Sequence, residues 1–139
     1  MPDLASFGKQ RLEGRIAYLA TVRPERLAPC SPRVSVLSGN DLCVYMEPTS
    51  PKVLDMRRNA RYAMHCAVED DSGGQGEFFV TGRAVEVDDA KTSGQAFEDA
   101  RMMAYSPQER HVLFELRIEE AMATVYENSR PKRSKWGAP

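Results

Sequence analysis

The sequence contains few of the residues that build metal centres, disulfide frameworks or catalytic triads. Its 139 residues include three cysteines and two histidines. The cysteines, Cys30, Cys43 and Cys66, form neither a CxxC pair nor a zinc-ligand spacing, and their number is odd. We therefore expect a reduced, cytoplasmic protein in which the thiols are buried as small apolar residues and no metal is bound.

Long apolar runs and an excess of one charge are also absent. No segment approaches the length of a membrane-spanning helix, and residues 1–4 lack the basic-then-apolar pattern of a signal peptide. The formal net charge of -1 implies no general affinity for nucleic acid or acidic membranes. These features predict one domain, residues 1–139, with neither a nucleic acid nor a membrane as its partner.

Neither histidine belongs to a recognisable catalytic pattern. We expect His65 to be packed or exposed on a strand, and His111 to face solvent just before another strand. The chain has no strained-nucleophile motif, no dinucleotide-binding glycine fingerprint and no Walker loop. No catalytic side chain is assigned.

Short β-forming segments and turn signals make up most of the chain. They predict strands at 16–22, 28–37, 42–46, 60–68, 77–87, 112–118 and 121–126, with Gly82 as a candidate bulge. Helices are predicted at 3–14, from Pro51 onward and at 90–104. Residues 128–139 form a basic tail with no predicted structure. This order favours a mainly antiparallel barrel with helices outside it over a doubly wound parallel sheet.

The stretch 45–59 combines a strand end, a short loop and a helix start. Ser50 can cap the helix with its hydroxyl, and Pro51 suits the first helical position. The free N–H groups, the hydroxyls of Thr49 and Ser50 and the ammonium of Lys52 would together suit a phosphate. The alternative is a plain capped helix with a solvated lysine.

The order of these elements resembles the pyridoxamine 5′-phosphate oxidase-like, flavin-binding split-barrel family. The segments that carry the resemblance are 19–22, 31–32, 42–45, 50–52, Leu54, 57–59, Arg61, 82–84 and Trp136. The resemblance spans nearly the whole chain. It implies a six-stranded antiparallel split β-barrel of Greek-key type with flanking helices, usually a homodimer with FMN or a related deazaflavin at the subunit interface.

The resemblance also implies which residues bind the cofactor. The matching positions are Pro32, Arg33, Val34, Ser35, Tyr45, Met46, Glu47, Thr49, Ser50, Lys52 and Trp136. Ser50 and Lys52 match phosphate-binding positions, and Thr49 could assist them. The segment 32–35 would line the flavin ring with its backbone, and 45–47 would lie beside it. For Arg33, an exposed strand arginine without a role is the alternative.

The chain departs from true pyridoxamine 5′-phosphate oxidases at its C-terminal end. Those enzymes carry an Arg-x-His substrate motif, whereas Trp136 is followed only by residues 137–139, with no histidine. The resemblance therefore implies the short, diverse branch of the family. We predict an FMN-binding oxidoreductase that transfers hydride to or from a small molecule, with a deazaflavin or haem as alternative cofactors. A non-catalytic flavin- or haem-binding sensor is the alternative function.

FMN is favoured over deazaflavin because the deazaflavin coenzyme needs a basic groove for its polyanionic tail. Lys9, Arg11 and Arg15 could supply that groove, but Asp3 and Glu13 dilute their charge.

Adjacent aromatic residues raise the question of a dimer. Phe78 and Phe79 must point to opposite faces of their strand, so one fills the barrel and the other needs a second apolar partner. That partner is either the helix from Ala90 or a second subunit. The resemblance favours a homodimer in which Trp136 or the basic tail contacts the other subunit's cofactor; a solvated tail is the alternative.

Overall fold

The computed structural model describes residues 3–24, 26–69 and 74–137. Its helices are α1 (Leu4–Leu12), α2 (Pro51–Arg58) and α3 (Ala90–Met102). Its strands are β1 (Ile16–Arg23), β2 (Arg26–Leu27), β3 (Ser31–Val34), β4 (Val36–Ser38), β5 (Asp41–Met46), β6 (Arg61–Cys66), β7 (Glu77–Glu86), β8 (Val112–Glu127) and β9 (Arg130–Gly137). None of the helices in these ranges is long and apolar enough to cross a membrane.

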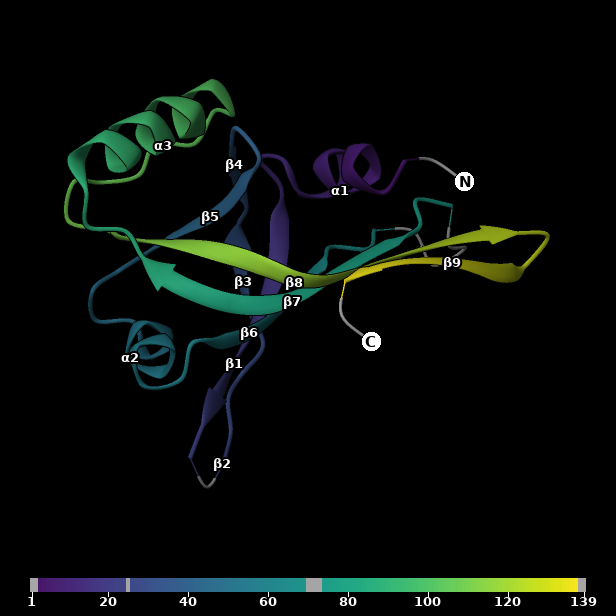
Figure 1. Ribbon diagram of the computed structural model, residues 1–139, viewed down its shortest axis with the longest axis horizontal. Helices are drawn as coiled ribbons and strands as arrows, with labels where there is room; N and C mark the ends of the chain where they lie inside the picture. The colour runs from purple at the N-terminus through teal and green to yellow at the C-terminus, as the bar shows by residue number, and fades with distance from the viewer. Residues whose placement is uncertain (1–2, 25, 70–73, 138–139) are drawn as a thin grey trace.

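The strands form one antiparallel sheet that closes into a six-stranded barrel. Neighbouring strands follow the order β1, β6, β7, β8, β5, β4. The circle closes because β3 and β4 are two parts of one segment: β3 pairs with β1, while β4 pairs with β5. The predicted split barrel is therefore confirmed. Figure 1 shows the strands wrapped around the barrel, with α2 and α3 on one side and α1 on the other.

The break between β3 and β4 falls at Ser35, inside the strand predicted at 28–37. The backbone N–H of Ser35 donates to the carbonyl of Arg15, and its carbonyl accepts from the N–H of Gly14. Both backbone groups are thus bonded to the turn between α1 and β1 instead of to a strand partner. Residues 28–30 are not in a strand, as expected next to Pro29, which has no N–H to donate.

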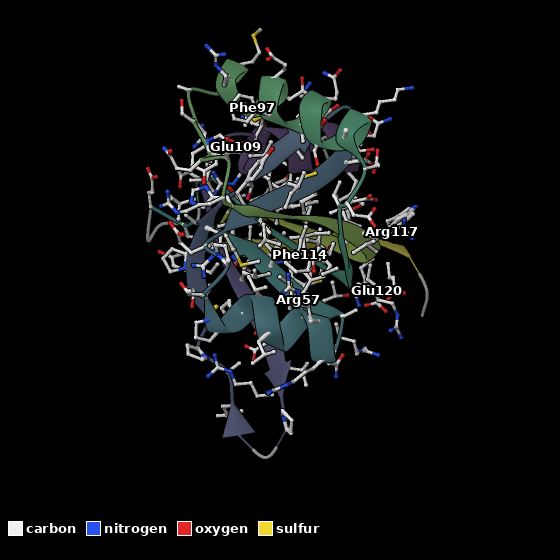
Figure 2. All side chains as sticks on the ribbon, turned by 90° about the vertical axis from the view of Figure 1, so that its left-hand side faces the viewer. Arg57, Phe97, Glu109, Phe114, Arg117 and Glu120 are labelled. Carbon is white, nitrogen blue, oxygen red and sulfur yellow. The ribbon has the colours of Figure 1, made fainter. Side chains whose placement is uncertain are left out.

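Apolar side chains fill the barrel, and a smaller cluster lies under α3. The barrel core contains Leu19, Val44, Met64, Val80, Phe114 and Leu116, among others. The second cluster contains Val36, Cys43, Ala96, Ala100 and Leu113. In Figure 2, Phe114 lies in the interior, with α2 below it and α3 above. Leu113 lies on the opposite, outer side of β8 and is buried there, because α3 covers that side.

The cysteine prediction is confirmed at two positions and wrong at one. Cys66 is buried in the barrel core and Cys43 is buried in the cluster under α3, whereas Cys30 is exposed. Cys30 lies outside the barrel strands, in the irregular segment between β2 and β3.

The C-terminal part of the chain differs most from the sequence prediction. The strands expected at 112–118 and 121–126 are one continuous strand, β8. The tail is also not structureless, because β9 pairs with β8 along its whole length. The chain reverses at Asn128 and Ser129, which adopt φ angles of 52° and 63°. The resulting β8–β9 hairpin projects from the barrel (Figure 1).

Gly82 marks a bulge between β7 and β8, as predicted. The register between the two strands shifts between Thr81 and Gly82. A Cβ at Gly82 would lie 1.8 Å from the carbonyl oxygen of Arg117. Only glycine therefore allows the two backbones to approach this closely.

Candidate functional site

Arg33 on β3 reaches the N-terminus of α2. Its Nη2 donates to Ser50 Oγ at 3.2 Å, and its Nη1 donates to the carbonyl of Pro32 at 2.7 Å. No ion pair joins Arg33 to a carboxylate within the described residues. Burial lowers the pKa of Arg33, although nearby Tyr105 opposes that effect. A half-buried guanidinium that lacks a counter-ion is well suited to an incoming anion.

Ser50 precedes α2 as predicted, but its hydroxyl makes no capping hydrogen bond. The expectation of a side-chain cap is wrong, because Ser50 Oγ accepts from Arg33 instead. The backbone N–H groups of the first turn are therefore not capped by this hydroxyl, which adds to the anion-binding character of the helix start.

Lys52 is buried beneath the start of α2, with only 2% of its surface exposed. Its Nζ donates to the carbonyl of Pro29 and to Thr21 Oγ1. Burial lowers the pKa of Lys52; the charge of Asp55 opposes this, and Arg33 and Arg23 add to it. The expectation that the N-terminus of α2 presents the Lys52 ammonium is therefore wrong. The Nζ is hydrogen-bonded inside the protein, beneath the first turn of the helix.

A buried carboxylate holds α2 against β1. Asp55 accepts from Thr21 Oγ1 at 2.9 Å and from Arg23 Nε at 3.0 Å. Asp55 pairs with Arg23 and acts on the charge of Lys52, on which the charges of Arg23 and Arg33 also act. The region is therefore electropositive, which favours a negatively charged ligand.

Two tyrosines lie beside the cationic group. The rings of Tyr45 and Tyr105 are 6.1 Å apart between centroids, at an interplanar angle of 52°. The hydroxyl of Tyr45 is buried without a hydrogen-bond partner among the described residues. Burial raises the pKa of Tyr45 to about 12, so this side chain remains a neutral phenol. A flat, partly polar ligand could pack on these rings and satisfy the buried hydroxyl.

Tyr105 was missed by the sequence analysis. It follows the end of α3, far along the chain from Arg33, and Ala104 before it adopts a φ of 61°. No motif marks the residue, because only the packing of α3 against β4 and β5 brings it to the site. The Arg33–Tyr105 neighbourhood is therefore a tertiary feature.

Glu47 makes intrachain contacts at the end of β5. Its carboxylate accepts from Arg110 Nε at 2.9 Å and from His111 Nε2 at 3.1 Å. These hydrogen bonds lower the pKa of Glu47 to about 2. The side chain of His111 is 14% exposed and also accepts from the N–H of Gln108, so the expectation that it faces solvent is wrong. This cluster fixes the loop before β8.

The remaining predicted residues are divided among several places. Pro32 and Thr49 are exposed near Arg33, Val34 is half-buried, and Met46 lies in the core. The side chain of Ser35 is buried against Met64, and its two backbone groups are already bonded. Trp136 lies on β9, 57% exposed, at a separate cavity of about 820 Å³ between α1 and β8. Within one chain, Trp136 is not part of the Arg33 group.

The site around Arg33 therefore combines Arg33, Ser50, Tyr45 and Tyr105, with Lys52 beneath. No cluster of three or more histidine, cysteine or acidic side chains suited to a metal ion occurs in the described parts of the chain.

The fold is shared with solved structures of flavin- and haem-binding proteins. A haem-binding protein from Mycobacterium smegmatis has a TM-score of 0.73 and 14% identity, covering 96% of this chain and 58% of its own. An FAD-binding protein from Mesorhizobium loti has a TM-score of 0.67 and 20% identity, over 88% and 94%. A pyridoxamine 5′-phosphate oxidase-type protein from Listeria innocua has a TM-score of 0.66 and 14% identity, over 84% and 90%. No family model and no curated protein sequence matches the chain.

Proposed function

We propose that this protein binds FMN, with the phosphate at Arg33 and the N-terminus of α2. The observation that carries the proposal is the half-buried Arg33 guanidinium, which is hydrogen-bonded to Ser50 and has no carboxylate partner among the described residues. Arginine presents a planar set of donors that matches phosphate oxygens, and the helix start adds backbone N–H groups. The flavin- and haem-binding proteins that share the fold support the same class of ligand.

The residues present fit a flavin better than a bare phosphate. The tyrosine pair beside Arg33 offers an aromatic surface, and the buried hydroxyl of Tyr45 offers an unsatisfied polar atom. Lys52 would contribute charge from beneath the site, while Ser50 and Thr49 would supply hydroxyls. In this assignment the backbone of 32–34 and the end of β5 would lie along the ring system.

An oxidoreductase is the activity that follows from this cofactor. A bound flavin supplies hydride transfer, and the protein contributes binding, orientation and electrostatics. In this proposal Arg33 and Lys52 stabilise the negative charge of the phosphate. Tyr45 and Tyr105 exclude water from one edge of the ring system. The substrate would be a small molecule.

Haem is a weaker candidate for this site. Both histidines of the chain are engaged elsewhere: His65 pairs with Glu77 at 3.3 Å, and His111 pairs with Glu47 at 3.1 Å. Neither is free to become an axial ligand without breaking an existing contact.

A carrier or sensor that binds flavin without turnover uses the same residues, so assays with NAD(P)H as electron donor are needed to separate it from an enzyme.

Deazaflavin is also less well supported than FMN. Lys9, Arg11 and Arg15, which could have formed a groove for its tail, do not line one common cavity. Lys9 pairs with Glu13 at 3.8 Å and borders the cavity near Trp136, whereas Arg11 is buried and borders a different cavity with Arg15.

We further propose that the cofactor lies at the interface of a homodimer. Arg33 and Ser50 lie on a half-exposed surface, and Trp136 lies on β9, paired with Ala121 where the β8–β9 hairpin leaves the barrel. A second subunit could bring its own hairpin, with Trp136 and the basic residues of β9, to this surface. That arrangement would bury a ligand of flavin size more completely than one chain can.

The visible absorption spectrum of the purified protein is the first test, because FMN, deazaflavin and haem differ in their bands. The second is a flavin-fluorescence titration of wild type and Arg33→Gln. We expect FMN affinity to fall by about tenfold or more, because a charge-assisted contact is lost. Arg58→Gln, an exposed arginine on the last turn of α2, is the control and should bind like wild type. Unchanged affinity in Arg33→Gln would refute the site.

A further inference from the structure

Arg11 is a buried cation without a counter-ion in the described structure. Its side chain is 6% exposed and runs from α1 to the end of β6. Nη2 donates to the carbonyl of Ala67 at 2.6 Å and lies 3.5 Å from Cys66 Sγ. Nε is buried and has no hydrogen-bond partner among the described residues. An arrangement of this kind is costly unless something else satisfies the charge.

A cavity of about 450 Å³ opens beside this guanidinium. Its lining residues are Phe7, Gln10, Arg11, Arg15, Gly74, Gln75, Gly76, Val125 and Tyr126. Arg15 is exposed and forms no ion pair within the described ranges, so the lining carries two positive charges and no negative one. The volume lies in the range of small-molecule sites.

Nearby acceptors are already used. The Glu77 carboxylate binds His65 Nε2 at 3.3 Å and accepts from the Tyr126 hydroxyl at 2.5 Å. The Cys66 sulfur accepts from the N–H of Phe78 at 3.2 Å as well as from Arg11. The sulfur contacts Nη2 only, which leaves Nε unsatisfied.

We propose that this cavity is a binding site for a compact oxyanion, a carboxylate or phosphate group, held by Arg11 and Arg15. The guanidinium of Arg11 would bind with its free Nε–H, and Arg15 would close over the ligand from the exposed side. The amide groups of Gln10 and Gln75 would supply further donors; the Oε1 of Gln75 accepts from the N–H of Glu69, and its amino group has no partner among the described residues. None of these residues belongs to the Arg33 site.

The test is an NMR titration that reads the Nε–H signal of Arg11 directly. The experiment uses the Arg33→Gln chain, so that the proposed flavin-phosphate site does not compete for the probe. Arg11→Lys identifies the signal by its loss. Inorganic phosphate and succinate are titrated separately, with chloride at equal ionic strength as the reference. These two arms distinguish a phosphate ligand from a carboxylate ligand.

We expect a saturable shift of the Arg11 signal with at least one of the two anions. Arg15→Gln should weaken binding by about tenfold, as expected for loss of a charge-assisted contact, and it avoids the folding risk of changing buried Arg11. Arg101→Gln, an exposed arginine on α3, should leave binding unchanged.

No saturable shift with either anion would overturn the proposal. The aspartates at positions 70 and 71 precede Gly74 in the sequence and offer a rival source of carboxylate. If anions bind only after both are changed to asparagine, the cavity is an intrachain contact and the proposal is also wrong.

Discussion

The side chains of Arg33 and Lys52 both lie near the start of α2, but substituting them should affect different properties. Lys52 donates to two groups inside the protein, whereas Arg33 reaches a half-exposed surface. We expect Lys52→Met to lower the free energy of unfolding by about 1–3 kcal/mol, because it leaves the Pro29 carbonyl unsatisfied. Arg33→Gln should change it by less than about 0.5 kcal/mol. Urea denaturation of both variants measures this; equal losses would contradict the buried role of Lys52.

His65 gives a pH-dependent contribution to stability. Hydrogen bonding with Cys66 and with Glu77 raises the pKa of His65 to about 9, although partial burial opposes this. Because the charged form is favoured in the folded state, its contribution is fully present below the ordinary value of 6.5 and is lost as pH rises through about 9.

Thermal unfolding across this pH range checks that expectation. The difference in melting temperature between wild type and His65→Gln should shrink from pH 6.5 to pH 9. Glu77→Gln removes the same ion pair and should show the same trend. A difference that stays constant with pH would rule out a charged His65.

Residues of the site were predictable only where neighbours in sequence define them. Ser50 and Lys52 were predicted because Ser50 and Pro51 are typical of a helix start. Arg33 was predicted because its segment matches the flavin-binding strand of the family that the sequence resembles. The direction of the Lys52 side chain could not be predicted, because it depends on the Pro29 carbonyl and on Thr21, which come from other parts of the chain. Tyr105 could not be predicted for the same reason, because the ring that it packs against, Tyr45, comes from β5.

At the scale of elements, Gly82 on β7 and Gly94 on α3 allow a matched comparison, because one is crowded by backbone and the other has open space beside it. A Cβ at Gly82 would strike the backbone of Arg117, whereas a Cβ at Gly94 on α3 would meet nothing within 4 Å. We expect Gly82→Ala to lower the free energy of unfolding by more than about 2 kcal/mol. Gly94→Ala should raise it by about 0.5–1 kcal/mol through its better helix propensity. Chemical denaturation compares the two; a stable Gly82→Ala would contradict the tight β7–β8 approach.

Strand β9 shows why some elements cannot be found from composition. Its residues are Arg, Pro, Lys, Arg, Ser, Lys, Trp and Gly, which include few β-formers. The strand exists because β8 extends beyond the barrel and leaves its backbone groups free to pair. Pro131 and the positive charges then lie on an outer edge, where they discourage further pairing.

The outer face of the barrel bears on the oligomeric state. Tyr18, His65, Phe79 and Met122 are consecutive cross-strand neighbours there. Helix α3 packs on the cluster around Val36 and Cys43, which does not include Phe79. The alternative in which α3 covers Phe79 is therefore wrong, and a second subunit is left as the apolar partner that we propose.

Light scattering at micromolar concentration tests the dimer. We expect twice the 15.6 kDa chain mass for wild type. Phe79→Glu should shift the protein toward the monomer and weaken FMN binding as well, whereas Arg101→Gln on α3 should do neither. A wild-type monomer that binds FMN tightly would refute the shared site.

The closure of the barrel also constrains how the chain can fold. Most strand pairs join neighbours in sequence, such as β4 with β5 and β6 with β7, and can form as local hairpins. The β5–β8 pair joins segments on either side of α2, β6, β7 and α3, so closing it carries a large loop-entropy cost. Until it forms, β5 and the first half of β8 are apolar strands with open edges. Refolding at high concentration should therefore lose material to aggregation through these two edges before the barrel closes.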